Sequence, residues 1–338
     1  MKHLLATISL CVCGTVYGQS SDSAQIYYQQ GLEQKNAKRY LIASQQFTKA
    51  LGFNPNHIDA LLEHAYTCME MRRTDQAKGL FVKVHELEPN NQKAIRELMN
   101  LYYNYRQFEK AIEMAQLCKD CTESYRISGM SLYQQEDYPA AEKALKTALS
   151  KNPQDAEATY TLARTYVDME EYKKAVPYYE KAVQMEGAKP IWMYEQGILL
   201  FNLSEYPKAM ASFLKAAENG YVQSHDFKEN LGYASLYSGD YDRGEKLLME
   251  IWSKKPGNKD LLRGLAEVLY QKQQFDRSLV YCQKLMEIDA NDGKALYQAG
   301  LCFQKKGEKD RGQQMCDKAI EMDPSLSSLR RKKEMVGL

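Results

Sequence analysis

Apolar residues between residues 156 and 189 fall on two separate stripes, each with the spacing of one face of an α-helix. The stripes consist of Leu162, Ala163 and Tyr166 on a first helix and of Tyr172, Ala175, Tyr179 and Ala182 on a second. The small residues allow the two helices to approach closely, and the large residues fill the space between them. The pattern therefore predicts a packed pair of helices within this stretch.

The same pattern recurs along the chain at a regular interval. Counting from residue 24, position 8 of each unit is small in all units but one, and position 20 is always small. The residues at position 8 are Gly31, Ala65, Met99, Gly129, Ala163, Gly197, Gly232, Ala266 and Gly300. The residues at position 20 are Ala43, Ala77, Ala111, Ala141, Ala175, Ala209, Gly244, Ser278 and Gly312. The period predicts nine units: 24–57, 58–91, 92–121, 122–155, 156–189, 190–223, 225–258, 259–292 and 293–326.

This pattern resembles the tetratricopeptide repeat (TPR), a helix-turn-helix unit of about 34 residues. The resemblance implies an all-α fold, a right-handed α-solenoid of about nine repeats within residues 19–326. A polar helix at residues 327–338 would cap the last repeat, which otherwise exposes its apolar face. The chain departs from the pattern in three places. Repeat three is four residues short, Ser224 is an extra residue before repeat seven, and Pro177 lies inside a second helix, where we expect a local irregularity.

The first residues have the pattern of an export signal. Lys2 supplies a positive start, residues 4–16 are apolar, and small or modest residues follow at a cleavage site. The apolar run is too short to span a bilayer. We expect a signal peptide at residues 1–18 and a mature chain in the periplasm or on the extracellular face of a Gram-negative bacterium. Lipoprotein anchoring is less favoured, because a bulky residue precedes both Cys11 and Cys13.

Composition and charge do not indicate nucleic-acid binding or catalysis. The chain has 45 basic and 44 acidic residues, so it lacks the positive excess that neutralises phosphates. Its histidines show no ligand spacing such as H-E-x-x-H, and its glycines follow repeat positions rather than a phosphate-binding loop. We therefore expect no catalytic residue, no metal, no cofactor and no nucleic-acid partner. No stretch after the signal is long and apolar enough for a membrane helix.

In TPR proteins the first helices of stacked repeats line a concave groove, and the resemblance places positions 2, 5, 9, 12 and 13 on that groove. The groove residues implied in repeats three to five are Arg96, Asn100, Tyr103, Asn104, Arg126, Met130, Tyr133, Tyr160 and Arg164. Those implied in repeats six to nine are Tyr194, Phe201, Asn202, Tyr233, Tyr237, Arg263, Tyr270 and Tyr297. Tyrosine and arginine often dominate binding hot spots. Each of these tyrosines either binds a partner or fills a gap between helices, and both interpretations remain open. For Arg96, Arg126 and Arg164 we favour binding, since three cations on consecutive first helices have no evident structural need.

Some TPR proteins bind the C-terminal tails of chaperones with a set of basic and Asn residues that hold two carboxylates. This chain matches only the part of that set that lies in the first of three successive repeats. Arg96 and Asn100 fit that part, whereas Ile127, Glu157 and Thr161 do not fit the rest of the set. We therefore predict an exported, non-catalytic scaffold that binds another protein or peptide in its groove. The alternative is recognition of a cell-envelope glycan, in which groove tyrosines would stack on sugar rings.

Residues 116–124, QLCKDCTES, place Cys118 and Cys121 at Cys-x-x-Cys spacing. The repeat register puts the pair at the end of the second helix of the shortened repeat three. Redox-active pairs usually hold their reactive cysteine at a helix N-terminus, where the thiolate is favoured, so this location argues against redox catalysis. A metal site would need two more ligands. A disulfide and two buried thiols both remain open, and the disulfide requires the helix to distort or to end between the cysteines.

Overall fold

The computed structural model describes residues 13–119 and 121–328, with side chains from residue 22 onward, and every regular element in this part is a helix. Residues 1–12 of the predicted signal peptide and residues 329–338 of the predicted capping helix lie outside it. None of the helices described is both long enough and apolar enough to cross a membrane.

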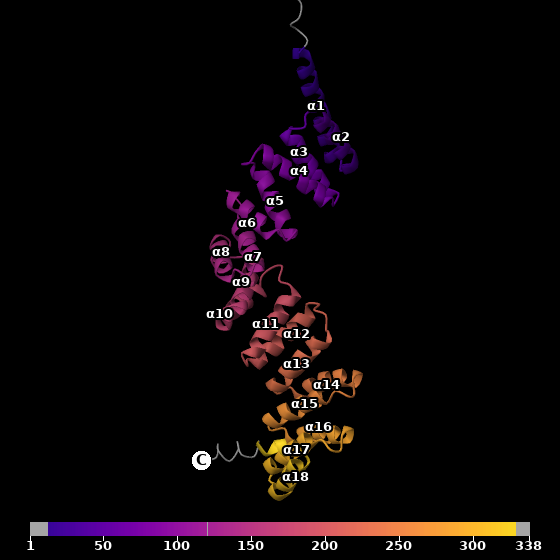
Figure 1. Ribbon diagram of the computed structural model, residues 1–338, viewed down its shortest axis with the longest axis vertical. Coiled ribbons are helices and arrows are strands. Elements are labelled where there is room, and N and C mark those ends of the chain that lie inside the picture. The colour runs from indigo at the N-terminus through magenta and orange to yellow at the C-terminus, as the bar shows by residue number, and fades with distance from the viewer. Residues whose placement is uncertain (1–12, 120, 329–338) are drawn as a thin grey trace, which may run out of the picture. The chain divides into compact units, whose positions relative to one another are not determined.

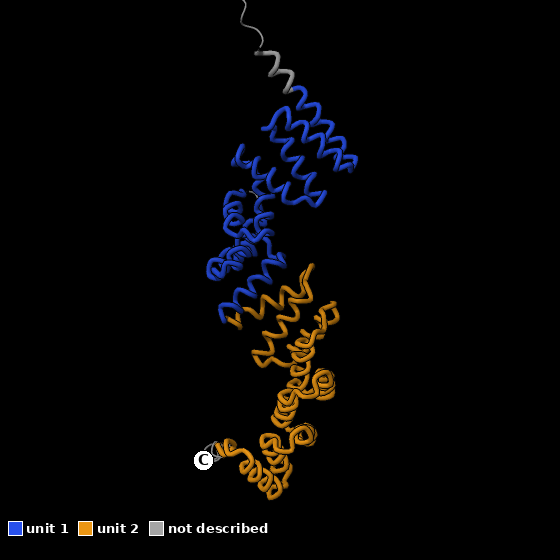
Figure 2. The backbone as a smooth tube through the Cα atoms, turned by 45° about the vertical axis from the view of Figure 1, so that its right-hand side comes forward, with its two compact units in different colours: residues 1–170 blue, residues 171–338 orange. Residues whose placement is uncertain are grey.

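The helices labelled in Figure 1 fall into two compact units, which Figure 2 shows in different colours. Unit 1, residues 1–170, contains α1 (Cys13–Asn36), α2 (Tyr40–Phe53), α3 (Ile58–Glu70), α4 (Thr74–Leu87), α5 (Gln92–Asn104), α6 (Phe108–Leu117), α7 (Ser124–Gln134), α8 (Tyr138–Lys151) and α9 (Ala156–Asp168). Unit 2, residues 171–338, contains α10 (Tyr172–Ala182), α11 (Pro190–Asn202), α12 (Tyr206–Glu218), α13 (His225–Ser238), α14 (Tyr241–Lys254), α15 (Lys259–Gln271), α16 (Phe275–Ile288), α17 (Gly293–Lys305), α18 (Lys309–Met322) and the 3-10 helix η1 (Pro324–Leu326).

The turns that follow the first helices share one backbone feature, a residue with positive φ at position 15 of the repeat. These residues are Lys38, Arg72, Arg106, Glu136, Glu170, Ser204, Gly239, Gln273 and Gly307. Only two of them are glycine, although the left-handed conformation costs a residue with a Cβ atom about 1 kcal/mol. Their spacing is that of the sequence repeat except at the shortened repeat three and at the extra residue before α13. The backbone therefore follows the period of the sequence.

Close packing within a repeat depends on the small residue at position 8. A Cβ atom on Gly31 would lie 2.4 Å from the ring of Phe47, and one on Gly197 would lie 2.5 Å from the ring of Phe213. Both rings are completely buried. Buried side chains of this kind form a core that extends over several repeats in each unit. The position-8 residue therefore sets the distance between the two helices of a repeat.

First helices also contact the first helices of neighbouring repeats. Such contacts join α1 to α3, α5 to α7 and α7 to α9 in unit 1, and α13 to α15 and α15 to α17 in unit 2. The first helices therefore form a layer in each unit, and this layer carries the predicted groove residues.

The irregular repeats have local explanations. Helix α6 ends at Leu117 after 10 residues, ahead of the Cys-x-x-Cys pair. Helix α10 continues through Pro177 but ends at Ala182 after 11 residues, whereas the unshortened second helices have 13 or 14. The extra residue Ser224 is the N-cap of α13, and its hydroxyl accepts the N–H of Phe227 at 3.2 Å. The insertion thus begins a helix in a repeat that lacks a proline turn.

Candidate binding surface

Two of the predicted groove arginines in unit 1 have structural partners. Arg96 Nε on α5 lies 3.4 Å from Glu123 Oε1, and Glu123 is the N-cap of α7. Arg126 Nε on α7 lies 3.2 Å from Asp155 Oδ2. Asp155 is the N-cap of α9 and accepts the N–H of Ala158 at 3.0 Å. The expectation that these arginines have no structural need was wrong, because each links its repeat to the start of the next first helix.

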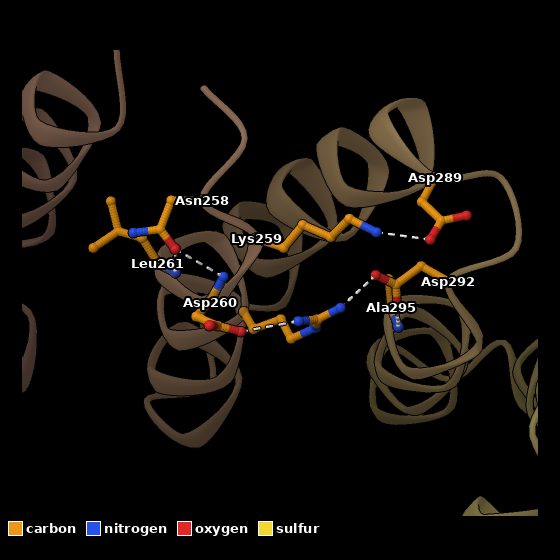
Figure 3. A network of polar contacts seen from close by, with 8 residues as sticks. Asn258, Lys259, Asp260, Leu261, Asp289, Asp292 and Ala295 are labelled. Atoms are coloured by element: carbon orange, nitrogen blue, oxygen red, sulfur yellow. Dashed lines mark hydrogen bonds and ion pairs between the residues drawn. The ribbon is translucent and has the colours of Figure 1, made fainter. Parts of the chain in front are cut away.

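Arg263 in unit 2 makes the same kind of link (Figure 3). Its Nη2 lies 2.8 Å from Oδ2 of Asp292, the buried N-cap of α17, and its Nη1 lies 3.0 Å from Asp260 Oδ1. Beside it, Lys259 Nζ donates to Asp289 Oδ2 at 2.7 Å. Two cations at the start of α15 therefore hold the segment that leads into α17.

Arg164 on α9 belongs to an aromatic cluster instead. Its guanidinium lies 5.1 Å from the ring centre of Tyr133 and 5.9 Å from that of Tyr160, within cation–π range. The hydroxyl of Tyr133 donates to Asp168 Oδ2 at 2.6 Å. Burial and this hydrogen bond raise the pKa of Tyr133. The structure thus brings together two predicted tyrosines and one predicted arginine, but Tyr133 itself is buried.

Several other predicted groove rings pack against an aromatic residue at position 17 of the same repeat. Tyr103 lies 6.0 Å from Phe108, and Tyr270 lies 5.7 Å from Phe275. Of the predicted polar residues, Asn100 donates its amide to the carbonyl of Arg96 at 3.1 Å. Asn104 is exposed and Met130 is half-buried. The gap-filling interpretation therefore explains Tyr103 and Tyr270.

The predicted tyrosines of α11 and α13 also contact other residues of unit 2, within the same repeat for Tyr194 and in neighbouring repeats for Tyr237 and Tyr233. Tyr194 stacks on Tyr221 with ring centres 4.6 Å apart, and Tyr237 stacks on Tyr206 at 4.4 Å. The hydroxyl of Tyr233 occupies the space that a side chain on Gly264 would need. Burial raises the pKa of Tyr233 to about 12. One face of Tyr194 and one face of Tyr237 are therefore covered by another ring of the chain.

A cavity of about 460 Å³ opens in unit 2 between α15, α16, α17 and η1. Two polar atoms here, Arg263 Nε and Gln298 Nε2, are buried and make no hydrogen bond within the described part of the chain. The Cys302 thiol lies near Gln298, but sulfur is a weak acceptor. Both residues line the cavity, and buried donors without good acceptors are rare in folded proteins, so these two atoms mark the cavity as a candidate site. The lining includes Arg263, Glu267, Cys282, Leu285, Lys294, Tyr297, Gln298, Ser325, Leu326 and Ser328.

The sequence prediction included only part of this cavity. Arg263 and Tyr297 were expected on the groove, although Tyr297 is buried. Lys294 stands at position 2, a groove position, so the repeat register was sufficient to identify it. Ser325 and Ser328 come from the end of the last repeat and beyond it, where the groove positions give no signal.

The structure joins Cys118 and Cys121 as a disulfide, with their Cα atoms 5.6 Å apart. Cys118 is the C-cap of α6, but Cys121 lies just ahead of α7. The assignment of both cysteines to the end of one helix was therefore wrong for Cys121. The four remaining described cysteines from Cys68 onward are buried thiols, and burial raises the pKa of Cys282 to about 12. Among the described residues, no three His, Cys, Asp or Glu side chains gather as a metal site would require.

Models of the tetratricopeptide repeat match residues 132–186 and 235–298, residues 160–220, and residues 293–326. The chain is a tetratricopeptide repeat protein. The all-α repeat fold predicted from the period of the sequence is confirmed.

Curated proteins with TPR sequences match the chain at low identity. A DnaJ homolog subfamily C member 7 homolog from Dictyostelium discoideum is 19% identical over 298 residues, covering 84% of this chain and 52% of the relative. The chain spans about half the length, or less, of the curated relatives it matches.

Solved structures with a similar fold include MamA (residues 41 to the end) from Desulfovibrio magneticus RS-1. It is 16% identical, covers 49% of this chain and 96% of that chain, and has a TM-score of 0.44. Another is YrrB, described as a TPR protein with an unusual peptide-binding site. It is 19% identical, covers 64% of this chain and 96% of that chain, and has a TM-score of 0.36.

Proposed function

We propose that this TPR protein is a non-catalytic scaffold that binds a protein or peptide on its layer of first helices, with the cavity of unit 2 as the main contact. The observation that carries the proposal is the pair of buried donors, Arg263 Nε and Gln298 Nε2, that make no hydrogen bond in the described chain. An unsatisfied buried donor costs about 1–3 kcal/mol. A ligand that supplies acceptors therefore removes a cost that the free protein carries.

The lining of the cavity favours a peptide segment as the ligand. Leu285 and Leu326 are almost completely buried and give it an apolar floor, while Lys294 is exposed at its rim. A backbone carbonyl or carboxylate oxygen satisfies the two donors, and an aliphatic side chain covers the floor. Convergent polar groups around an apolar base are typical of small binding sites.

Glycan recognition is less well supported. Sugar binding by stacking requires exposed ring faces, but Tyr194 stacks on Tyr221 and Tyr237 stacks on Tyr206. Salt dependence separates the two classes, because contacts to Lys294 and Arg263 weaken when salt screens them. Binding that is insensitive to salt would favour the glycan.

The proposal is tested with a photo-crosslinking amino acid at Ser328, which lines the cavity and is exposed, and, as a control, at Lys318, which lies exposed on the second helix α18. We expect a crosslinked polypeptide from Ser328 and none from Lys318. For the polypeptide so identified, Lys294→Glu should weaken binding about tenfold, and the matched Lys318→Glu should leave it unchanged. Equal crosslinking from both positions, or equal effects of both variants, would contradict a site in this cavity.

We further propose that the protein is exported from a Gram-negative cell and acts in the periplasm or at the extracellular face. The support is the sequence pattern of residues 1–18. N-terminal sequencing of the protein from its native host should begin just after Gly18. An intact N-terminus on protein recovered from the cytoplasm would contradict export.

A further inference from the structure

The corner between α6 and α7 places Cys118 and Cys121 in different electrostatic surroundings. Cys118 is the C-cap of α6, and its N–H donates to the carbonyl of Met114 at 3.0 Å. Cys121 lies two residues before Glu123, the N-cap of α7. The guanidinium of Arg96 approaches it from α5, with Nε 3.5 Å from Cys121 Sγ. The sulfur of Cys118 thus lies at the C-terminus of α6, where carbonyl groups are free, and that of Cys121 lies near the N-terminus of α7 beside the guanidinium of Arg96.

This asymmetry decides which sulfur better carries a negative charge. Helix C-termini disfavour anions, whereas helix N-termini and arginine favour them. Two carboxylates oppose a negative charge on Cys121. Glu123 pairs with the guanidinium of Arg96 at 3.4 Å, and Glu97 lies near both Arg96 and Glu123. Burial raises the pKa of Glu97, so its charged form is itself disfavoured. Arg96 therefore makes Cys121 the better thiolate of the pair.

Hydrogen bonds hold the corner independently of the sulfur–sulfur bond. Gln92 Oε1 accepts the N–H of Lys119 at 2.9 Å, and Gln92 Nε2 donates to the carbonyl of Leu117 at 3.4 Å. On the other side, the hydroxyl of Ser124 donates to the carbonyl of Cys121 at 2.9 Å. The bond between the cysteines can therefore open while the flanking backbone stays in place.

We propose that Cys118 and Cys121 form a thiol–disulfide exchange site for small thiols. A thiolate attacks Sγ of Cys118, the disulfide breaks, and Cys121 leaves as a thiolate beside Arg96. A second thiolate attacks the substrate sulfur of the mixed disulfide and displaces Cys118, which takes up a proton. Two thiols lose two electrons to become one disulfide, and the protein disulfide gains them. Cys118 is 6% exposed and Cys121 is 7% exposed, so we expect the substrate to be a small thiol rather than a folded protein.

The first test uses the full-length protein in glutathione buffers of graded redox ratio. In unfolded, unreduced protein, we expect Cys118 and Cys121 to resist alkylation while the buried thiols of the fold react. In the folded protein, the pair should become reduced and reoxidised reversibly as the glutathione ratio changes. A pair that is alkylated without reduction, or that glutathione never reduces in the folded protein, would overturn the proposal.

The second test compares the two cysteines of the reduced, folded protein with iodoacetamide near pH 6.5, using peptide mass spectrometry. We expect Cys121 to react about tenfold faster than Cys118. Arg96→Gln should slow Cys121 about fivefold, whereas Arg126→Gln, which removes the equivalent pair one repeat later, should not. Equal rates for the two cysteines, a comparison that needs no variant, would overturn the proposal. Equal effects of the two arginine variants would do the same.

Discussion

Arginine at position 5 recurs as a link between repeats. Arg96, Arg126 and Arg263 each reach the acidic residue at the N-cap position of the next first helix. In the pairs of Arg126 and Arg263 the carboxylate also accepts a backbone N–H at the helix start, so one pair fixes both the cap and the position of the next repeat, whereas the side chain of Glu123 accepts none. The pair of Arg263 is the most enclosed, because the side chain of Asp292 is only 4% exposed.

Removing this arginine should leave a buried charge without its counter-ion. We expect Arg263→Met to lower the free energy of unfolding by about 2 kcal/mol, measured by urea denaturation. The control is Lys208→Met, whose pair with Glu205 is largely exposed, and it should not shift the midpoint. Similar effects of the two variants would show that enclosure of the Arg263 pair has no bearing on stability.

A buried histidine should make stability depend on pH. His64 is 4% exposed, its Nε2 lies 2.9 Å from Ser44 Oγ, and burial lowers its pKa from the ordinary value of 6.5. The unfolded chain therefore takes up a proton that the folded chain resists. The folded state is not penalised by His64 above about pH 6.5, where the histidine is neutral in both states. The free energy of unfolding then falls as the pH drops from there through the lowered pKa of His64.

The measurement compares urea midpoints at pH 7.5 and 5.5 for the wild type and for His64→Gln, which keeps an amide for Ser44. We expect the wild type to lose more stability between these pH values than the variant does. His225→Gln removes an exposed histidine and should retain the wild-type loss. If His64→Gln loses as much as the wild type, another group causes the dependence.

At the scale of the helix, glycines that look alike in sequence have opposite roles. Gly197 on α11 faces the buried ring of Phe213, whereas a Cβ atom on Gly79 of α4 would meet nothing within 4 Å. In repeat two, Ala65 stands at the same repeat position as Gly197, and Phe81 stands at the same position as Phe213. Ala65 and Phe81 are both buried. A methyl group at this position is thus compatible with the fold once the ring has moved.

Alanine at these two sites should therefore change stability in opposite directions. Gly197→Ala should destabilise by about 1–3 kcal/mol because it overpacks the helix pair. Gly79→Ala should stabilise by about 0.5–1 kcal/mol because it removes backbone freedom from an exposed helix interior. Thermal unfolding of both variants tests this, and shifts of the same sign would contradict the packing described for Gly197.

For the whole molecule, the repeat architecture limits how far a local change can travel. Helices within a unit contact mainly their neighbours along the chain. In such arrays stability is approximately a sum of repeat and nearest-neighbour terms. Local opening should therefore stay local rather than unfold all repeats together.

Hydrogen exchange detects this behaviour. In Gly197→Ala we expect faster amide exchange in α11, α12 and the adjoining α13, with α1 to α4 unchanged. The matched control Gly79→Ala should not accelerate exchange in α11. A uniform increase along the chain would instead indicate one cooperative unit.

The sequence predicted the fold well because the packing that defines it is local. The residues that set helix spacing, such as Gly197 and Phe213, lie within one repeat and recur with its period. The candidate site was harder, since a tyrosine at a groove position can turn toward solvent or toward its neighbour. Tyr103 and Tyr133 do the latter, and only geometry shows this. The links of Arg126 and Arg263 left a signal in the sequence, an aspartate directly before the next first helix, that the groove positions alone do not include.

The left-handed turn residues at position 15 have a consequence for protein engineering. Seven of the nine carry a side chain in a conformation that glycine adopts freely. They lie in separate repeats, so the effects of substituting them should add. Glycine at each turn should recover several tenths of a kcal/mol after its own entropy cost is subtracted. Thermal tolerance can therefore be raised by substitutions at seven separate turns, none of which lines the cavity proposed as the binding site.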